Sequence, residues 1–313
     1  MKNLPFDLDL SGKTVVITGG GGVLCSGFAK TAAACKAKVA VLDLKKEAAD
    51  KVADEINAEG GKAIAIAANV LDKASMEAAK AIVDKEFGGC DILINGAGGN
   101  NPKGSTTKDY LEEADLENNV DVTGIKTFFD LDPDGVSFVF NLNFLGTLIP
   151  TQVFAKDMAK RAETSIINVS SMNAFRPLTR IPAYSGAKAA VSNFTQWLAV
   201  HFSKVGIRVN AIAPGFFSTA QNKALLYNED GSLSARSEKI LAHTPMGRFG
   251  VPEDLDGALL YGQYRSLSKT RERWCQDAGS PAGVCLAGRG WRVPGHISAG
   301  VQVVRAHHRL TAH

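Results

Sequence analysis

Two kinds of hydrophobic pattern alternate along the chain. Short continuous apolar runs, bounded by Gly, Asn or Asp, are typical of strands that are buried on both faces. They predict strands at residues 14–18, 38–42, 62–67, 91–95, 165–170 and 208–213. Longer segments with apolar residues at helical spacing predict helices at residues 24–36, 45–59, 73–87, 135–161 and 184–205. This alternation favours an α/β fold, in which right-handed crossovers build a parallel sheet with helices on both faces.

One segment between the fourth strand and the next helix fits neither pattern. Residues 99–137 are rich in Asn, Thr, Asp and Glu, and a connection of this length is unusual inside a compact domain. We therefore expect a functional loop or cap there. Residues 1–261 are enough for one large domain, and they contain no internal repeat and no low-complexity linker.

The composition is that of an ordinary globular protein, with 45% hydrophobic residues, 21% charged residues and a net charge of +3. This charge is too small to indicate nucleic acid as a partner. No apolar stretch of the sequence reaches the ~20 residues of a membrane span, and the N-terminus lacks the apolar core of a signal peptide. The five cysteines fit no zinc spacing. We therefore expect no metal site, no membrane partner, free thiols and a cytoplasmic location.

The composition changes abruptly after residue 261. Residues 262–313 contain seven arginines, one lysine and two acidic residues, whereas residues 1–261 contain six arginines, twenty-one lysines and thirty acidic residues. The charge balance is therefore +6 in this tail and −3 in the rest of the chain. Such a break predicts that the tail differs from the domain in origin or in role.

A glycine-rich turn follows the first predicted strand. Thr18 precedes four consecutive glycines, where the backbone could approach a pyrophosphate closely at the N-terminus of the next helix. By itself, such a turn is as well explained by a mobile loop. Asp43 ends the second strand, where its carboxylate would accept hydrogen bonds from both ribose hydroxyls and repel a 2′-phosphate. This favours NAD over NADP, although Asp43 alone could equally be a helix N-cap.

A second cluster combines Ser171, Tyr184 and Lys188. Tyr184 and Lys188 are four residues apart in a predicted helix and therefore share one face. A neighbouring ammonium favours the phenolate and lowers a tyrosine pKa from about 10 toward neutral pH. Tyr184 could then act as a general acid or base at a carbonyl or alcohol, with Ser171 holding the substrate oxygen. An amphipathic surface pair is the usual alternative for such a spacing.

Taken in this order along the chain, these motifs resemble those of the short-chain dehydrogenase/reductase family, over nearly all of residues 10–261. The resemblance implies a doubly wound Rossmann fold and a nicotinamide-dependent oxidoreductase. It implies that Tyr184 is the catalytic acid or base, that Ser171 binds the carbonyl oxygen and that Asn143 anchors a relay water. Lys188 would bind the nicotinamide ribose and acidify Tyr184. The matching elements are the TGGGG turn, Asp43, the motif Asn95-Gly96-Ala97-Gly98, Asn143, Ser171, Tyr184, Lys188, the pair Pro214-Gly215 and Thr219.

The same resemblance implies a set of residues that bind the cofactor, NAD rather than NADP. Val23 and Cys25 stand where the family has glycines, and the preceding glycine run would shift the tight turn earlier. Asn69 replaces an aspartate near the adenine and can still bond to the ring. The implied set is Thr18, Gly19, Gly20, Gly21, Gly22, Val23, Leu24, Asp43, Leu44, Asn69, Val70, Asn95, Gly96, Ala97, Gly98, Tyr184, Lys188, Pro214, Gly215, Phe217 and Thr219.

Longer segments resemble one bacterial group within the family, the D-mannonate oxidoreductases or fructuronate reductases, which interconvert D-fructuronate and D-mannonate. These segments are ITGGGGVLCSGFAK, NGAGGNNPKGSTT, HTPMGRFGVPEDL and residues 126–158, and the acidic cap is typical of the group. A sugar acid needs a cation in its pocket, preferably a forked guanidinium. Arg176 is the leading candidate, with a solvated loop arginine as the alternative, and Lys103 and Arg180 follow. Ser171 and Asn173 are the other expected substrate contacts.

The resemblance also predicts a final parallel strand, followed by a Val-Asp-Gly-Gly turn, that the tail does not supply. We therefore expect the last strand to be missing or replaced, the sixth strand to be an exposed edge, and stability and activity to be reduced. A frameshift near codon 262 would explain the change, and a genuine basic extension that binds an acidic partner is the alternative. A homotetramer or homodimer is expected if the C-terminus allows it. Other functional interpretations are a reductase of another polyol or keto-sugar, and a non-catalytic nucleotide-binding domain.

Overall fold

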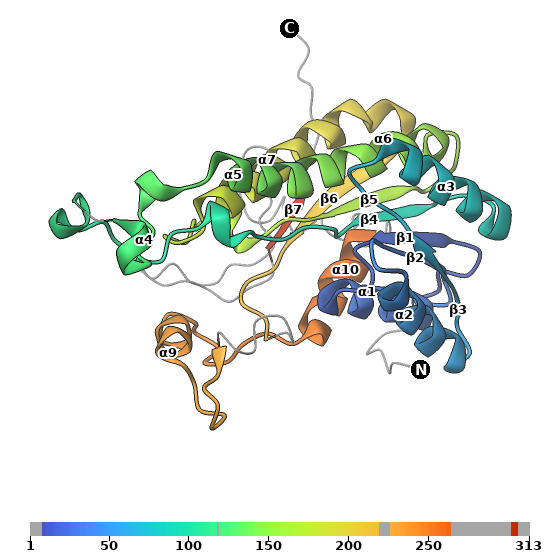
Figure 1. Cartoon of the computed structure of the whole chain (residues 1–313). Helices are drawn as coiled ribbons and strands as arrows, with labels where there is room; N and C mark the ends of the chain where they lie inside the picture. The colour runs from blue at the N-terminus through green and yellow to red at the C-terminus, as the bar shows by residue number, and fades with distance from the viewer. Residues whose placement is uncertain (1–7, 118, 219–225, 264–301, 306–313) are drawn as a thin grey trace, which may run out of the picture.

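A seven-stranded sheet forms the centre of the fold (Figure 1). The computed structural model describes residues 8–117, 119–218, 226–263 and 302–305, and in this part of the chain the strand order is β3-β2-β1-β4-β5-β6-β7. The first six strands run parallel, and the last runs antiparallel to β6. The strands are β1 (Thr14–Thr18), β2 (Lys38–Asp43), β3 (Lys62–Ala67), β4 (Ile92–Asn95), β5 (Ser165–Val169), β6 (Arg208–Ala213) and β7 (Gln302–Arg305).

Helices cover both faces of this sheet, as the alternating pattern predicts. Helices α3, α6 and α7 lie on one face, and α1, α2 and α10 lie on the other (Figure 1). The helices are α1 (Val23–Ala34), α2 (Lys46–Ala58), α3 (Lys73–Phe87), α4 (Val120–Thr123), α5 (Pro133–Phe140), α6 (Gly146–Met158), α7 (Pro182–His201), α9 (Ala235–Ala242) and α10 (Asp256–Gln263). The predicted doubly wound α/β architecture is therefore confirmed.

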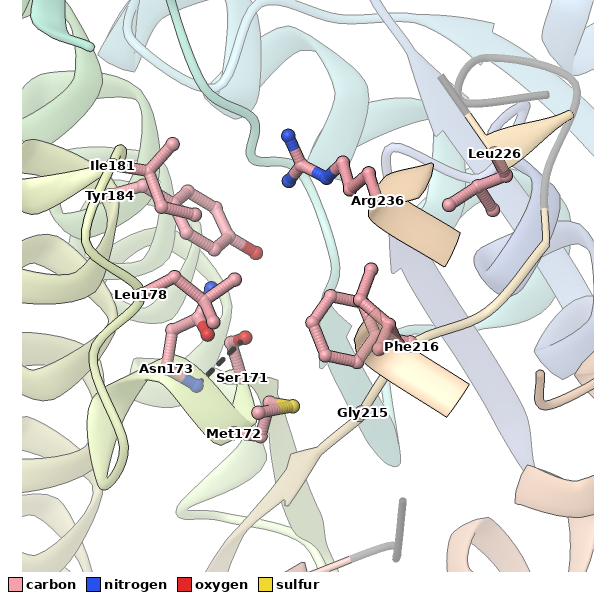
Figure 2. A pocket seen from close by; sticks show the side chains of 11 residues that line it. Ser171, Met172, Asn173, Leu178, Ile181, Tyr184, Gly215, Phe216, Leu226 and Arg236 are labelled. Carbon is pink, nitrogen blue, oxygen red and sulfur yellow. Dashed lines mark hydrogen bonds between the residues drawn. The ribbon is translucent and has the colours of Figure 1, made fainter. Parts of the chain in front are cut away.

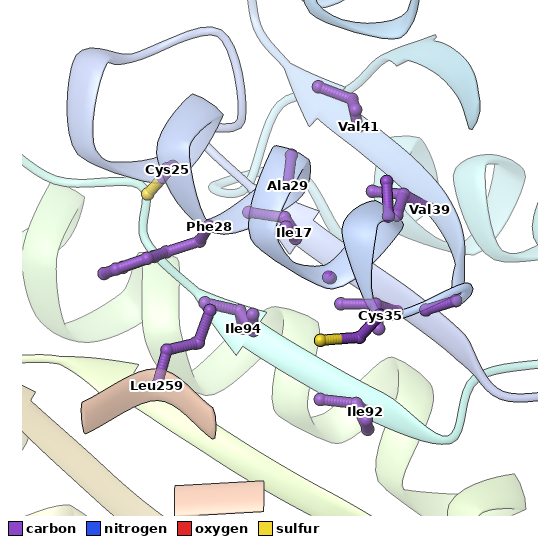
Figure 3. Close-up of a cluster of buried hydrophobic side chains, with 14 of the residues drawn as sticks. Ile17, Cys25, Phe28, Ala29, Cys35, Val39, Val41, Ile92, Ile94 and Leu259 are labelled. Atoms are coloured by element: carbon purple, nitrogen blue, oxygen red, sulfur yellow. The ribbon is translucent and has the colours of Figure 1, made fainter. Parts of the chain in front are cut away.

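The sheet is buried because each of the six parallel strands contributes side chains to two hydrophobic clusters. All five residues of β1, TVVIT, are buried. Neighbouring strand residues point to opposite faces, so Ile17 packs with Phe28 and Leu259 in one cluster (Figure 3), while Val16 packs with Phe154 in the other. Continuous apolar strands such as β1 are therefore what a sheet covered on both sides requires.

The strand order reverses between β1 and β4. The chain builds from β1 outward to β3, then returns to the other side of β1 and continues from β4 to β6. In open α/β sheets, ligands bind beyond the carboxyl ends of the strands at this reversal. Strands β1, β2 and β4 end at Thr18, Asp43 and Asn95. We therefore expect a ligand site next to the residues that follow these three.

Helices α5 and α6 are continuous through a π-helical segment at Asn141–Leu145. This segment interrupts the regular helix predicted over residues 135–161, and single π-helical turns are frequent at functional sites. The whole stretch Pro133–Met158 is long and apolar enough to span a membrane, but half of its most apolar window is buried inside the domain. Its apolar character therefore reflects its position as a core helix against the sheet.

The segment predicted as a cap, residues 99–137, consists of short helical turns joined by local hydrogen bonds. Asp115 accepts a hydrogen bond from Lys108 Nζ at 2.7 Å, and the Thr106 N–H donates to the Arg180 carbonyl at 2.9 Å. The turns are Pro102–Gly104, Glu113–Asp115, α4 and Phe128–Asp130. The cap is thereby attached to the loop between β5 and α7.

The seventh strand differs from the parallel strand that the family resemblance predicts. β7 pairs antiparallel with β6, with Val303 opposite Ile212 and Arg305 opposite Asn210. The expected last strand is thus replaced, whereas the expectation that β6 has an unpaired edge is wrong, because β7 occupies that edge. Residues 264–301 and 306–313 lie outside the described residues, so the origin of the tail stays a prediction.

Candidate active site

The glycine turn after β1 packs closely against the backbone that follows β4. Gly19 has a φ of +64°, and a Cβ built on it would lie 2.9 Å from the Ala97 backbone. The turn is held by hydrogen bonds from the Gly20 N–H to the Leu42 carbonyl at 2.9 Å and from the Gly22 N–H to the Gly19 carbonyl at 3.0 Å. Gly22 is the N-cap of α1 and provides no side-chain cap. The first N–H groups of α1 are therefore suited to bind a pyrophosphate.

The two departures from the family's glycine pattern have a structural explanation. Helix α1 begins at Val23, so Val23 and Leu24 present backbone N–H groups at its N-terminus whatever their side chains. The side chain of Cys25 packs against Gly96, where a Cβ would overlap its Sγ. Burial raises the pKa of the Cys25 thiol to about 12, so this cysteine is an inert packing residue.

Asp43 is bonded to the glycine turn from the end of β2. Its Oδ2 accepts a hydrogen bond from the Gly21 N–H at 3.0 Å, and its Oδ1 accepts one from the Lys45 N–H at 3.0 Å. Lys45 is the N-cap of α2, so the alternative that Asp43 is the N-cap is wrong. Each carboxylate oxygen keeps a second lone pair that can accept a bond from a ribose hydroxyl. The residues at this position therefore fit a dinucleotide.

The predicted adenine contacts lie at the ends of the neighbouring strands. Leu44 is 71% exposed beside Asp43, and Val70 is buried. Asn69 Oδ1 accepts a hydrogen bond from the Leu71 N–H at 3.0 Å. Among the described residues the Asn69 amide nitrogen has no partner, so it can donate to a purine ring. An exposed apolar side chain next to a free amide donor is suited to hold adenine.

Asn95 joins the sheet to the helix above it. Its Nδ2 donates to Thr151 Oγ1 at 3.0 Å and to Asn168 Oδ1 at 2.9 Å. One strand away, Thr18 Oγ1 accepts a hydrogen bond from the Gly96 N–H at 3.1 Å. These bonds connect β1, β4, β5 and α6 at the point where the glycine turn begins.

Ser171, Tyr184 and Lys188 converge from two elements. Ser171 follows β5, and its Oγ accepts a hydrogen bond from the Asn173 N–H at 3.2 Å. Tyr184 and Lys188 lie one turn apart at the start of α7, with Lys188 Nζ 5.6 Å from the centroid of the Tyr184 ring. The ammonium donates to the Val169 carbonyl at 2.7 Å. The fold thus brings together the three residues that the sequence singled out.

Burial moves the pKa values of this pair in opposite directions. It raises the pKa of Tyr184 above its usual value, and a hydrogen bond with Ser171 acts in the opposite direction. It lowers the pKa of Lys188 to about 8. In the chain without a dinucleotide, desolvation of the phenolate is thus the largest influence on Tyr184. That Lys188 makes Tyr184 more acidic beside a bound dinucleotide stays a prediction.

Asn143 lies in the π-helical segment and is fully buried. Its Nδ2 donates to the Val139 carbonyl at 2.7 Å and to the Gly99 carbonyl at 2.8 Å. A Cβ on Gly98 would lie 2.6 Å from Asn143 Oδ1, so the glycine is needed for this contact. The side chain thus fastens the start of the cap to the helix. The Asn143 carbonyl accepts a hydrogen bond from the Thr147 hydroxyl at 2.9 Å. The expected role of Asn143 in anchoring a relay water stays a prediction.

A cavity of about 190 Å³ opens beside Ser171 and Tyr184 (Figure 2). It is smaller than the roughly 300–1,000 Å³ typical of sites for drug-sized ligands, and so suits a small molecule. Within the described part of the chain, no three His, Cys, Asp or Glu side chains gather as metal ligands would. The cavity is lined by Ser171, Met172, Asn173, Leu178, Ile181, Tyr184, Gly215, Phe216, Leu226, Arg236 and Ile240.

The basic residues predicted to bind a substrate carboxylate are not among those that line the cavity. Arg176 is exposed on the loop after Ser171. Lys103 Nζ lies 3.6 Å from Asp132, and Arg180 Nε donates to Asp109 at 2.6 Å. The two second-choice candidates are therefore already paired with acidic residues of the cap.

The residues after β6 divide between the cavity and the core. Gly215 lines the cavity, while the Pro214 carbonyl accepts a hydrogen bond from the Met172 N–H at 3.0 Å. Phe217, predicted to contact the cofactor, is buried in the core cluster of α1 and α2. Thr219 lies outside the described residues.

Seven lining residues were not among the sequence predictions. Three of them, Met172, Leu178 and Ile181, lie between β5 and α7, and the other four are Phe216, Leu226, Arg236 and Ile240. These four follow the last predicted strand in a region without clear periodicity. The spacing of Arg236 and Ile240, four residues apart in a short helix, was the only available signal, and it does not indicate which way that helix faces.

Comparison with known proteins places this geometry in a family. A family model of short chain dehydrogenases matches residues 13–230. An uncharacterised oxidoreductase of Haemophilus influenzae is 59% identical over 83% of this chain and 89% of its own length. The uncharacterised oxidoreductase UxuB of Bacillus subtilis is 51% identical over 82% of this chain and 90% of its own length.

A crystal structure of similar sequence carries a bound dinucleotide. It is that of a provisionally assigned D-mannonate oxidoreductase from Haemophilus influenzae, with NAD bound. The identity is 58% and the TM-score 0.77, over 82% of this chain and 89% of that chain. With the matched family model and the site geometry, these likenesses show that this chain is an oxidoreductase of the short-chain dehydrogenase/reductase family.

Proposed function

We propose that this chain is an NAD-dependent oxidoreductase that interconverts D-fructuronate and D-mannonate. One observation carries the proposal: Ser171 and Tyr184 line the same small cavity, which Gly215 after β6 lines as well. The 58% identity to a provisionally assigned D-mannonate oxidoreductase with bound NAD supports both the substrate and the cofactor.

The preference for NAD rests on Asp43. Its two oxygens are held by the Gly21 and Lys45 N–H groups at 3.0 Å, which aims the carboxylate at the ribose position. A 2′-phosphate there would meet a fixed negative charge, whereas two hydroxyls would each donate a bond. The α1 N-terminus would hold the pyrophosphate.

Tyr184 transfers the proton at the substrate oxygen, and Ser171 positions that oxygen. Ser171 Oγ holds the oxygen. The Tyr184 phenolate oxygen takes the alcohol proton on oxidation and becomes the phenol, and the phenol gives this proton to the ketone oxygen on reduction. Burial keeps Tyr184 protonated near neutral pH, which prepares it to act as an acid in the reducing direction. A bound nicotinamide supplies the two-electron chemistry, since it takes up the C–H hydrogen with its electron pair on oxidation and returns it on reduction.

The test is NADH formation from D-mannonate and NADH consumption with D-fructuronate by the purified protein. We expect both reactions with NAD or NADH, and lower efficiency with NADP or NADPH. A panel of other polyols and keto-sugars tests the alternative that the protein is a reductase of such a compound. Turnover of one of them, with no turnover of D-mannonate or D-fructuronate, would refute the proposed substrate.

Tyr184→Phe is the matched control for the chemistry. It removes one oxygen from a half-buried ring, so we expect turnover to fall about 10²- to 10⁴-fold while the fluorescence titration with NADH is unchanged. NADH binding by the wild-type protein without turnover of any substrate would favour a non-catalytic nucleotide-binding domain instead.

A further inference from the structure

The cavity wall opposite Tyr184 is formed by helix α9 and the residues before it. Arg236 and Ile240 line this wall together with Leu226, and Figure 2 shows the Arg236 guanidinium extending into the space between α9 and Tyr184. Among the described residues Arg236 has no ion pair and no side-chain hydrogen bond. An arginine that lines a cavity without a partner leaves its five N–H donors to a ligand.

The neighbouring cations are not available in the same way. Arg180 and Lys239 both face Asp109 of the cap, with Arg180 Nε at 2.6 Å and Lys239 Nζ at 3.9 Å. Lys103 lies 3.6 Å from Asp132. Arg236 is therefore the cavity-lining cation whose charge the described part of the chain leaves unbalanced, and a carboxylate is the anion that a planar guanidinium binds best in two parallel hydrogen bonds.

The orientation of α9 is fixed by its two serines. Ser234 is the N-cap, and its Oγ accepts a hydrogen bond from the Ser237 N–H at 3.2 Å. Ser237 is fully buried, and its hydroxyl donates to the Leu226 carbonyl at 2.6 Å. With Ser237 turned inward, Arg236 and Ile240, four residues apart, share the face toward the cavity. The position of Arg236 thus follows from local hydrogen bonds.

A second observation points to the same ligand. Asn173 is 6% exposed, lines the cavity, and its Oδ1 has no hydrogen-bond partner in the described part of the structure. A buried acceptor without a partner costs roughly 1–3 kcal/mol. A ligand hydroxyl in the cavity would donate to it. Arg236 on one wall of the cavity and the unpaired Asn173 Oδ1 beside Ser171 together fit a ligand that has a carboxylate at one end and hydroxyls along its chain.

We propose that Arg236 binds the carboxylate of the substrate and that Asn173 accepts a hydrogen bond from a hydroxyl close to the reacting carbon. This rests on the proposed function, which supplies a hydroxy acid as the substrate class. The assignment replaces Arg176 with a residue sixty positions later in the sequence, from a different wall of the cavity.

The experiment compares an acid with its neutral counterpart. D-Mannonate and D-mannitol differ in one terminal group, a carboxylate against a hydroxymethyl. The ratio of their kcat/KM values, acid over polyol, should fall about 10- to 100-fold in Arg236→Met, which loses a charge-assisted pair. Lys239→Met removes a charge from the same helix outside the cavity and should leave the ratio unchanged. Arg176→Met tests the competing candidate and should also leave it unchanged.

Binding provides a readout that does not depend on turnover. The Kd of D-mannonate for the NADH-loaded protein, measured by calorimetry, should rise about 10- to 100-fold in Arg236→Met and partly recover in Arg236→Lys. Asn173→Leu should weaken the acid and the polyol alike, without loss of thermal stability, because it removes an unpaired buried acceptor.

The outcomes separate the two proposals. Wild-type protein that neither oxidises nor binds D-mannonate refutes the proposed function. Wild-type protein that oxidises D-mannonate, with Kd and ratio unchanged in Arg236→Met, overturns the inference alone. A fall in the ratio for Arg176→Met, with none for Arg236→Met, restores the first candidate and also overturns it.

Discussion

At the scale of single residues, Lys188 is a candidate functional side chain whose burial destabilises the folded protein. Lys188 is 4% exposed, and its ammonium donates to the Val169 carbonyl at 2.7 Å. Burial lowers its pKa from 10.5 to about 8, because the folded state disfavours the charged form. Because burial of this charge does not stabilise the fold, the position of Lys188 supports the proposed role of its charge beside Tyr184 and a bound dinucleotide.

The low pKa of Lys188 predicts a pH dependence of stability. The lysine of the unfolded chain keeps its proton up to about pH 10.5, whereas the folded one loses it near pH 8. Between these pH values the unfolded state binds more protons, so this residue makes the free energy of unfolding rise with pH, by up to about 3 kcal/mol. Below pH 8, Lys188 is charged in both states, and the burial of its charge lowers the free energy of unfolding by the full amount.

Lys188→Met should remove that rise. Urea denaturation at pH 7 and at pH 10 gives the free energy of unfolding of both proteins, and the difference between them should shift by about 2–3 kcal/mol in favour of wild type at the higher pH. Effects of other titrating groups cancel in this comparison. A difference that is the same at both pH values would show that Lys188 is not desolvated as described.

At the scale of elements, the first strand-turn-helix unit is shaped by close backbone contact. Gly19 has a φ of +64° and lies where a Cβ would come within 2.9 Å of the Ala97 backbone. Gly88 at the end of α3 has a φ of +81° but open space around it. The two glycines therefore share the left-handed conformation and differ in their neighbours.

This difference predicts different costs of an added methyl group. Gly88→Ala should lower the free energy of unfolding by about 1 kcal/mol, through backbone strain alone. Gly19→Ala should lower it further and should weaken NADH binding, because the turn must move away from β4. Urea denaturation and NADH fluorescence titration measure the two effects. Equal losses of stability with unchanged NADH affinity would mean that the close approach is not required.

At the scale of the whole molecule, the site is assembled from segments that are far apart in the sequence. The proposed dinucleotide site lies at the ends of β1, β2 and β4, and the cavity is lined by the loop after β5, α7 and α9. Asp109 of the cap faces Arg180 on one side and Lys239 of α9 on the other. These exposed ion pairs add little stability. They neutralise Arg180 and Lys239 near the cavity, so Arg236 is the unpaired cation among the described residues that line it.

The tail carries a prediction of its own. Six strands are parallel and β7 is antiparallel, whereas the family resemblance predicts a last parallel strand followed by a Val-Asp-Gly-Gly turn. Sequencing the source gene beyond codon 261 should reveal a shifted reading frame that encodes this segment. A protein with the restored terminus should melt at a higher temperature. An intact gene without such a frame, or equal melting and turnover for both proteins, contradicts the frameshift.

The sequence by itself determined the order and type of the main elements and most of the candidate catalytic cluster. Apolar runs such as TVVIT can be buried on both faces only in a covered sheet. Tyr184 and Lys188 share a helix face because of their spacing alone. Asp43 and the glycine turn follow strand ends, and all parallel strands of a sheet end at the same edge. These inferences need only local geometry and one rule of topology.

Only the tertiary structure decided which charged side chain reaches the cavity and what burial does to the site. Arg176 is close to Ser171 in the sequence, yet Arg236 lines the cavity, because Ser237 holds α9 with that face inward. The raised pKa of Tyr184 and the lowered pKa of Lys188 arise from desolvation by packed neighbours. Contacts and dielectric surroundings of this kind depend on residues brought together from the whole chain, which spacing along the sequence does not reveal.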